Sequence, residues 1–137
     1  MSAPALRVAH LYPRLMNIYG DRGNVMCLRR RCEARGIRFD LRELGLRDHY
    51  DAGAHDLIFA GGAQDREQRA VADDLLATKA AGIREAVEGG VALLAVCGAY
   101  QLFGRFYRDA SGAELPGAGI FDLHTEHPGE GDRKSVV

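Results

Sequence analysis

The feature that most constrains the fold is an apolar run, Val91–Val96, that ends directly at the pair Cys97-Gly98. An unbroken apolar run of this kind is typical of a strand that is covered on both faces, as the strands of a parallel sheet are. A second short run, Asp56–Ala60, ends in the same way at Gly61-Gly62. Because glycines end strands and open loops, both runs predict strands of one sheet whose carboxyl ends lead into glycine-bearing loops.

The segments around these two strands predict an alternation of strands and helices. The expected strands are Leu6–Tyr12, Ile37–Leu44, Asp56–Ala60, Val91–Val96 and Gly119–Leu123, and the expected helices are Arg22–Arg35 and Glu67–Glu88, with a hairpin turn at Tyr107–Gly112 and the start of a further strand at Val136-Val137. This order predicts one domain, residues 1–137, of the doubly wound α/β class, with a mostly parallel sheet and helices on both faces. The alternating pattern of Ile37–Leu44 predicts a strand near an edge, and Asp56–Ala60 predicts a central strand.

Charge and composition narrow the possible functions. The chain has 18 Lys+Arg and 19 Asp+Glu, and this balance argues against a protein that mainly grips nucleic-acid phosphates or an acidic membrane face. The basic run Arg29–Arg31 falls inside an expected helix and is interpreted as a solvated helix face. No apolar run approaches the roughly 20 residues that span a bilayer, and Met1–Pro4 does not open a signal sequence. A cytoplasmic location is therefore expected.

The three cysteines predict neither a disulfide framework nor a zinc site. Cys27, Cys32 and Cys97 form an odd set without CxxC spacing and without a nearby histidine cluster. Cys27 and Cys32 lie within an expected helix, where a free cysteine usually packs in the core or at its boundary. The sequence contains no metal or nucleotide motif, so no metal or cofactor is expected on this chain.

Cys97 differs from the other two cysteines because it stands between a buried strand and the first turn of a helix. A residue in that sharp turn is pushed out of the sheet, as in a nucleophile elbow. The N–H groups at the helix start favour the thiolate, which is the reactive form of cysteine. The N–H of Gly98 and a second N–H from the Gly61-Gly62 loop are predicted to stabilise the oxyanion that forms when sulfur attacks a carbonyl carbon.

Three separated segments resemble one enzyme family. Ala95–Gly104, with the sequence AVCGAYQLFG, looks like the nucleophile motif of class I glutamine amidotransferases of the cobyric acid synthase type. Tyr12–Asn24 (YPRLMNIYGDRGN) and Gly61–Gln68 (GGAQDREQ) are similar to segments of the glutamine amidotransferase subunits of lipid II isoglutaminyl synthases. The likeness extends from about Leu6 to Arg133, which is nearly the whole chain.

The resemblance implies a glutaminase that releases ammonia from L-glutamine through a cysteine thioester. A Mur-ligase-like, ATP-using synthetase subunit would be its partner in a heterodimer and would use the ammonia to amidate the D-glutamate of lipid II in peptidoglycan biosynthesis. By the family match Cys97 is the nucleophile, and Gly62 and Gly98 are oxyanion-hole positions. Gln101 and Arg133 are the implied substrate-binding residues. Two alternatives stay open: a glutaminase domain of the cobyrinic acid amidating type, and a non-catalytic docking module or fragment of the same fold.

The sequence departs from the family at two glycines and at the catalytic base. Ala63 and Ala99 stand where the family has glycine, and the added methyl group restricts the backbone wherever φ is positive. His124-Thr125-Glu126 has the His-x-Glu spacing that orients an imidazole in many class I amidotransferases, but it matches a family segment that precedes the catalytic histidine. The base is expected beyond Val137, so the chain looks C-terminally truncated, and we expect little glutaminase turnover from this chain alone.

Overall fold

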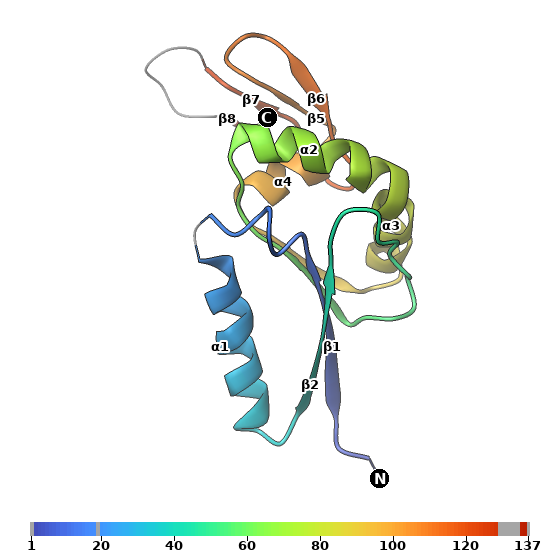
Figure 1. Ribbon diagram of the computed structural model, residues 1–137. Helices are drawn as coiled ribbons and strands as arrows, with labels where there is room; N and C mark the ends of the chain where they lie inside the picture. The colour runs from blue at the N-terminus through green and yellow to red at the C-terminus, as the bar shows by residue number, and fades with distance from the viewer. Residues whose placement is uncertain (1, 19, 129–134, 137) are drawn as a thin grey trace.

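The computed structural model describes residues 2–18, 20–128 and 135–136, and it is an α/β structure with two sheets (Figure 1). The larger sheet holds the parallel strands β1 (Ala5–Leu11), β2 (Arg38–Leu44), β3 (Leu57–Ala60) and β4 (Ala92–Ala95). The described helices are α1 (Asp21–Glu33), α2 (Asp65–Asp74), the π-helix η1 (Leu75–Lys79), α3 (Ala80–Glu88) and α4 (Gly98–Phe103). The order of elements confirms the doubly wound α/β class that the sequence predicts.

The strands of the larger sheet have the spatial order β2-β1-β3-β4. β1 is central, and its residue Val8 pairs with Leu41 of β2 on one side and with Leu57 of β3 on the other. The chain therefore moves outward from β1 to β2 and then crosses back to place β3 on the opposite side of β1. Such a reversal opens a crevice at the carboxyl ends of β1 and β3, and in doubly wound sheets ligands bind in this crevice.

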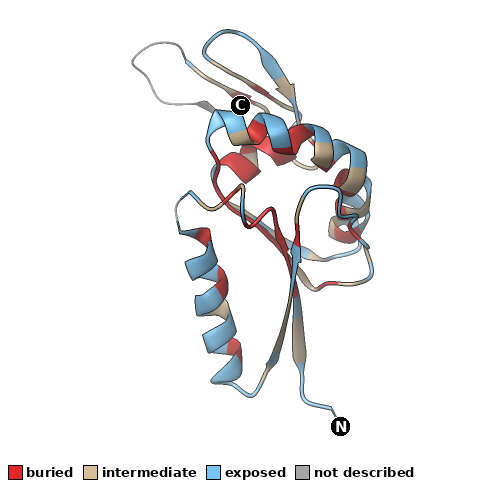
Figure 2. Ribbon diagram, in the orientation of Figure 1, coloured by how far each residue is buried: buried red, intermediate tan, exposed pale blue. Residues whose placement is uncertain are grey.

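Helices cover both faces of the larger sheet, with α1 on one face and α2, η1 and α3 on the other (Figure 1). Successive residues of a strand point to opposite faces. The residues of β1 and β3 that face α2 and η1 are almost fully buried and belong to the core: Ala9, Leu11, Ile58 and Ala60. Figure 2 shows the same division, because buried residues run along the carboxyl half of β1 and the inner face of α2 while most of α1 is exposed.

The helices differ from expectation in one place. The sequence predicts a single helix over Glu67–Glu88, and the structure interrupts it with η1. The wider π turn ends at Lys79, whose φ of −129° departs from helical values. Its side chain is fully buried and forms an ion pair of 2.7 Å with Asp74. None of the helices in the described part of the chain has the length and apolar character needed to cross a bilayer.

A smaller sheet follows α4 along the chain. Its described strands, in the spatial order β6-β5-β7-β8, are β5 (Phe106–Arg108), β6 (Glu114–Pro116), β7 (Thr125–Glu126) and β8 (Ser135–Val136). β5 and β6 are antiparallel, which confirms the hairpin expected around Tyr107–Gly112. Figure 1 shows this sheet beyond α2 and α4, on the side where β1 and β2 end.

The strand expected at Gly119–Leu123 is wrong. The N–H groups of Ile120 and Phe121 both donate to the carbonyl of Phe103 at 2.9 Å, so the segment follows the end of α4 instead of pairing in a sheet. Phe121 packs against the core, and its ring meets that of Phe103 edge to face at 6.2 Å. The apolar residues of this segment therefore cover a helix, which a local strand pattern does not distinguish from sheet pairing.

The strand expected at Val91–Val96 exists as β4, but its surroundings differ from the prediction. Its apolar sequence predicts a strand that is covered on both faces. In the described sheet β4 is an outer strand, and Leu94 on it is 52% exposed. One face of β4, beside α1, is therefore partly exposed to solvent.

Candidate active site

Cys97 lies in the turn between β4, which ends at Ala95, and α4, which begins at Gly98. Its backbone has a φ of 52° and a ψ of −111°, a conformation that residues other than glycine rarely adopt. The residue is exposed. A strained strand-to-helix turn that presents its side chain is the geometry of a nucleophile elbow. The turn that the sequence predicts at Cys97 is therefore present.

Gly98, the first residue of α4, lies against the glycine loop, residues 61–64, that follows β3. A Cβ on Gly98 would lie 2.6 Å from Gln68 Nε2, 2.9 Å from the Ala63 nitrogen and 3.1 Å from the Ala63 oxygen. Backbone atoms at such distances leave no room for a side chain, so only glycine fits between the two segments. The Ala99 N–H also donates to the Gly61 carbonyl at 3.3 Å. The nucleophile turn and the glycine loop are thus packed backbone to backbone.

The glycine loop also contacts Asp21, the first residue of α1. Asp21 is 1% exposed, and its Oδ2 accepts a hydrogen bond of 3.1 Å from the Gly62 N–H. A Cβ on Gly61 would lie 2.3 Å from Asp21 Cγ, so the approach of this side chain requires a glycine there. The N–H of Gly62, a predicted oxyanion donor, is therefore engaged by a carboxylate inside the protein.

A buried pair of glutamines joins the glycine loop to the nucleophile helix. Gln68 Nε2 donates to the Ala63 carbonyl at 3.2 Å and to Gln101 Oε1 at 2.9 Å. Gln68 and Gln101 are 1% and 7% exposed. The side chain of Gln101 therefore links α4 to α2 and, through Gln68, to the loop, while its predicted contact with a substrate stays a prediction.

The other candidate residues have more varied positions. Arg133, the second predicted substrate-binding residue, lies outside the described residues. Cys32 is buried, as a packing role requires, whereas Cys27 is exposed on α1.

His10 and His55 are buried, and burial lowers the pKa of both imidazoles. Burial therefore favours the neutral form of both rings.

His124 directly precedes β7 of the smaller sheet. Its ring stacks on Phe106 with the centroids 4.6 Å apart, and its Nε2 lies 3.5 Å from Glu126 Oε1. The same Glu126 oxygen forms an ion pair of 2.6 Å with Arg108. Within the described chain the contacts of His124 are with these neighbours, and Cys97 is not among them. The His124 ring therefore contacts residues of β5 and β7.

A hollow of about 430 Å³ adjoins the glycine loop at the crevice between β1 and β3. The residues that line it come from the loop after β1, from the glycine loop and from the start of α2: Arg14, Leu15, Asn17, Ile18, Ala63, Gln64 and Glu67. The Ile18 N–H donates to the Gly62 carbonyl at 3.3 Å and so joins the loop after β1 to the glycine loop. A guanidinium, two amides and the carboxylate of Glu67 line this concave surface, which suits a small polar ligand.

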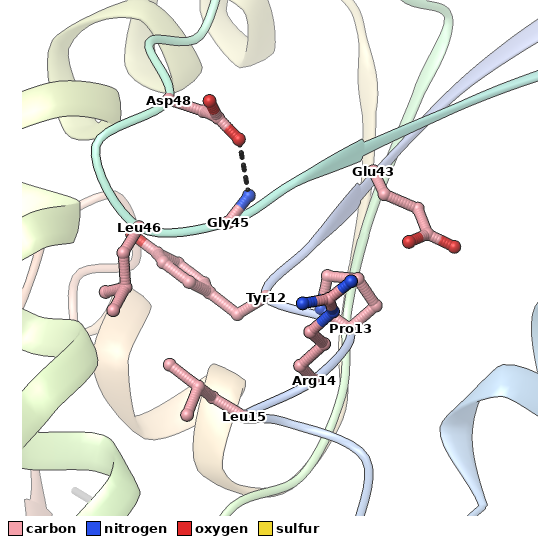
Figure 3. Close-up of a pocket in the computed structure, with 8 residues that line it drawn as sticks. All are labelled: Tyr12, Pro13, Arg14, Leu15, Glu43, Gly45, Leu46 and Asp48. Carbon is pink, nitrogen blue, oxygen red and sulfur yellow. Dashed lines mark hydrogen bonds between the residues drawn. The ribbon is translucent and has the colours of Figure 1, made fainter.

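A larger hollow of about 470 Å³ opens at the carboxyl ends of β1 and β2 (Figure 3). Its lining residues are Tyr12, Pro13, Arg14, Leu15, Glu43, Gly45, Leu46 and Asp48. Figure 3 shows the Tyr12 ring between the two loops and the hydrogen bond of 2.9 Å that the Gly45 N–H donates to Asp48. Because β3 separates β1 from β4, this hollow belongs to the opposite half of the sheet from Cys97.

Tyr12 is fixed by a buried charge cluster on α2 and η1. Its hydroxyl donates to Asp74 Oδ2 at 2.6 Å, and Lys79 Nζ donates to the same oxygen at 2.7 Å. The Arg47 N–H donates to the other oxygen of Asp74 at 2.7 Å. Burial raises the pKa of Asp74, but the hydrogen bonds from Lys79 and Tyr12 outweigh burial and lower that pKa to about 2. The cluster ties the loops after β1 and β2 to the helices that cover the sheet.

The sequence of this chain matches a known protein family. The model of the CobB/CobQ-like glutamine amidotransferase domain matches residues 7–134. That range includes the start of α1, the glycine loop and the Cys97 turn. The chain belongs to the CobB/CobQ-like glutamine amidotransferase family.

Curated relatives of this amidotransferase domain are known in several bacteria. The chain is 40% identical over 120 residues to subunit GatD of the glutamine-hydrolyzing lipid II isoglutaminyl synthase of Streptococcus pneumoniae, across 88% of this chain and 46% of the relative. It is 36% identical over 121 residues to the GatD subunit of Staphylococcus aureus, across 88% and 49%. A cobyric acid synthase of Pelotomaculum thermopropionicum is 32% identical over 94 residues, across 62% and 17%. The chain thus spans about half the length of the GatD relatives that it matches.

Two residues that hold the glycine loop of this amidotransferase domain are not singled out by sequence reasoning. Asp21 falls inside the segment Tyr12–Asn24 that resembles the family, so a signal exists. Its contact with Gly62 joins positions 41 apart, which only the fold brings together. Gln68 reads as an ordinary polar residue on a helix, and no local pattern indicates that it is buried.

Proposed function

We propose that this chain is the glutaminase subunit of a lipid II isoglutaminyl synthase, with Cys97 as its nucleophile. The observation that carries the proposal is the Cys97 turn, where an exposed thiol at a φ of 52° adjoins a glycine loop packed against Gly98. Membership of the glutamine amidotransferase family supports an enzyme-related role. The identity of 40% to a glutamine-hydrolyzing GatD subunit supports this particular reaction more than the lower and less extensive similarity to cobyric acid synthase does.

In the proposed reaction the Cys97 sulfur attacks the side-chain amide carbon of L-glutamine. The carbon–nitrogen bond breaks, the nitrogen takes a proton and leaves as ammonia, and a γ-glutamyl thioester remains until water hydrolyses it to glutamate. The oxygen of the tetrahedral intermediate carries negative charge. The N–H of Gly98 and one N–H of the glycine loop would stabilise this oxygen, and loss of one such donor costs roughly 100- to 1,000-fold in kcat in other enzymes.

In the proposed reaction the base that transfers the proton is a residue outside those that the structure describes. His124 is held by Phe106 and Glu126, and His10 is buried in β1. The ammonia would pass to an ATP-using, Mur-ligase-like synthetase subunit that amidates the D-glutamate of lipid II. That the GatD relatives are themselves named as subunits supports a partner of this kind. We assign ATP to that partner and no cofactor to this chain.

The experiment that tests the function compares two nitrogen sources. The natural gene product that carries this sequence is combined with its Mur-ligase-like synthetase, lipid II and ATP, and either L-glutamine or an ammonium salt is supplied. Amidated lipid II is measured by mass spectrometry. We expect amidation with both nitrogen sources, because the synthetase can take ammonia from solution.

The variant Cys97→Ser separates the two activities of the complex. We expect it to lose amidation driven by glutamine and to keep amidation driven by ammonium. Cys27→Ser, which changes the other exposed cysteine, is the matched control and should keep both. Glutamine-driven amidation that survives in Cys97→Ser, or that never occurs while ammonium-driven amidation does, would refute the proposed function.

A further inference from the structure

Asp21 is a buried carboxylate that the proposed reaction does not use directly. Its side chain is 1% exposed at the start of α1, where a helix N-terminus favours a negative charge. Oδ2 accepts the Gly62 N–H at 3.1 Å, and Oδ1 has no hydrogen-bond partner within the described part of the chain. Burying a carboxylate is costly unless its oxygens are bonded. Because a single backbone hydrogen bond does not offset this cost, we expect the Asp21 carboxylate to have a function at the glycine loop.

Two further hydrogen bonds fix the same loop. The Ile18 N–H donates to the Gly62 carbonyl at 3.3 Å, and Gln68 Nε2 donates to the Ala63 carbonyl at 3.2 Å. In a trans peptide the N–H and the C=O point in opposite directions, so the Ala63 N–H points away from Ile18. The Ala63 nitrogen lies 2.9 Å from the place where a Cβ on Gly98 would be. The loop N–H that borders the nucleophile turn is therefore that of Ala63.

We infer that Asp21 is the positioning residue of the oxyanion hole. By accepting the Gly62 N–H, it fixes the loop so that the Ala63 N–H, and not the Gly62 N–H, stands beside Gly98 as the second donor. The inference rests on the proposed function, because an oxyanion forms only if Cys97 attacks a carbonyl group. Asp21 itself does not touch the reacting atoms and acts through the loop.

The glutamine analogue 6-diazo-5-oxo-L-norleucine tests this role. The Cys97 sulfur bonds to the terminal carbon of the analogue, N₂ leaves, and the thiol proton ends on that carbon, so the labelling needs no separate base. The ketone oxygen of the analogue takes the place of the amide oxygen and needs the same donors. Iodoacetamide labels the thiol without such donors. The ratio of the two labelling rates at Cys97, measured by mass spectrometry, therefore reports on the oxyanion hole and not on thiol reactivity.

Three variants of Asp21 separate position from charge. Asp21→Ala removes the acceptor, and we expect the ratio to fall about tenfold or more. Asp21→Asn keeps an oxygen that accepts the Gly62 N–H and should restore the ratio to within about threefold of wild type. Asp21→Glu keeps the charge, but its longer side chain does not fit against Gly61, whose Cβ position lies 2.3 Å from Asp21 Cγ. The ratio of the two labelling rates in Asp21→Glu should therefore fall as far as it does in Asp21→Ala. Asp73→Ala removes an exposed carboxylate on α2 and is the matched control.

A wild-type ratio in folded Asp21→Ala overturns the inference. If the alanine variant does not fold, Asn and Glu decide: rescue by Asn alone supports the positioning role, and equal ratios in the two variants overturn it. A wild-type chain that the analogue labels no faster at Cys97 than at Cys27 refutes the proposed function instead, so the two failures are distinguishable.

Discussion

Replacing Gly98 by alanine tests the backbone contact on which the site depends. The new Cβ would lie 2.9 Å from the Ala63 nitrogen and 2.6 Å from Gln68 Nε2, whereas ordinary contacts begin at 3.4 Å. To reach an ordinary contact, the separation must grow by about 0.5 Å at the Ala63 nitrogen and by about 0.8 Å at Gln68 Nε2. The side-chain amide of Gln68 has some freedom to move. The Ala63 backbone has little, because its carbonyl accepts the Gln68 hydrogen bond and the neighbouring Gly62 carbonyl accepts that of Ile18.

This displacement has a cost in stability and in reactivity. Overpacking of this kind typically lowers the free energy of unfolding by about 1–3 kcal/mol, which for a chain of 137 residues lowers Tm by roughly 3–5 °C per kcal/mol. A misplacement of about 1 Å can cost about 100-fold in rate, so half of that should slow labelling of Cys97 by 6-diazo-5-oxo-L-norleucine about tenfold. Calorimetry gives the first quantity and a mass-spectrometric time course gives the second.

Gly23→Ala is the matched control for this substitution. Gly23 lies within α1, and a Cβ there would meet no atom within 4 Å. Alanine in a helix is favoured over glycine by up to about 1 kcal/mol, so this variant should be slightly more stable and should label at the wild-type rate. A Gly98→Ala variant with wild-type Tm and wild-type labelling would refute the contact, and so would an equal loss in both variants.

Two further predictions concern the ion pair between Asp74 and Lys79 and the role of His124. The pKa of Asp74 is lowered from 3.8 to about 2 in the folded chain, so its pairing with Lys79 contributes fully above about pH 4 and is lost as the pH falls through about 2. In urea titrations the difference in unfolding free energy between wild type and Asp74→Asn should shrink by about 2 kcal/mol from about pH 6 to about pH 2, and a difference that does not change with pH would contradict the pairing. His124→Ala removes the stack on Phe106 and should cost about 1 kcal/mol of stability, with unchanged analogue labelling of Cys97; slower labelling would place His124 in the site.

The layered fold could be predicted from sequence because its signals are local. The apolar run Asp56–Ala60 stops at glycines and does form a central strand, and the alternating Ile37–Leu44 does form an edge strand. The turn at Cys97 was predictable because a strand signal and a helix signal meet there without a linker. Each of these inferences needs only neighbours in the sequence.

The errors arise where distant segments decide the structure. Gly119–Leu123 has the apolar content of a strand, yet it packs on α4 because Phe103 offers a carbonyl that accepts two N–H groups. The exposure of Leu94 depends on which elements lie beside β4, and nothing within Val91–Val96 states that. The long helix is interrupted by η1, where the buried Lys79 bonds to Asp74 five positions away, and a helical pattern does not reveal this contact.

The same distinction applies to the candidate site. The glycine-bearing loop at Gly61 and the turn at Gly98 were predictable because each follows directly on a strand or on Cys97. The side chains that make those glycines necessary, Gln68 and Asp21, belong to other elements, and their roles depend on contacts across the fold. That the Gly62 loop supplies an oxyanion donor stays a prediction, and the hydrogen bond that the Gly62 N–H donates to Asp21 was not foreseen from the sequence.

Cys97 as the nucleophile that attacks glutamine is tested most directly by mapping the label of 6-diazo-5-oxo-L-norleucine on the wild-type chain. Cys27 is exposed as Cys97 is, so it is an internal control for ordinary thiol reactivity. We expect the label on Cys97 at a dose that leaves Cys27 unmodified, and we expect L-glutamine, but not D-glutamine, to slow the labelling. Equal labelling of the two cysteines, or labelling that L-glutamine does not slow, would contradict the role of Cys97.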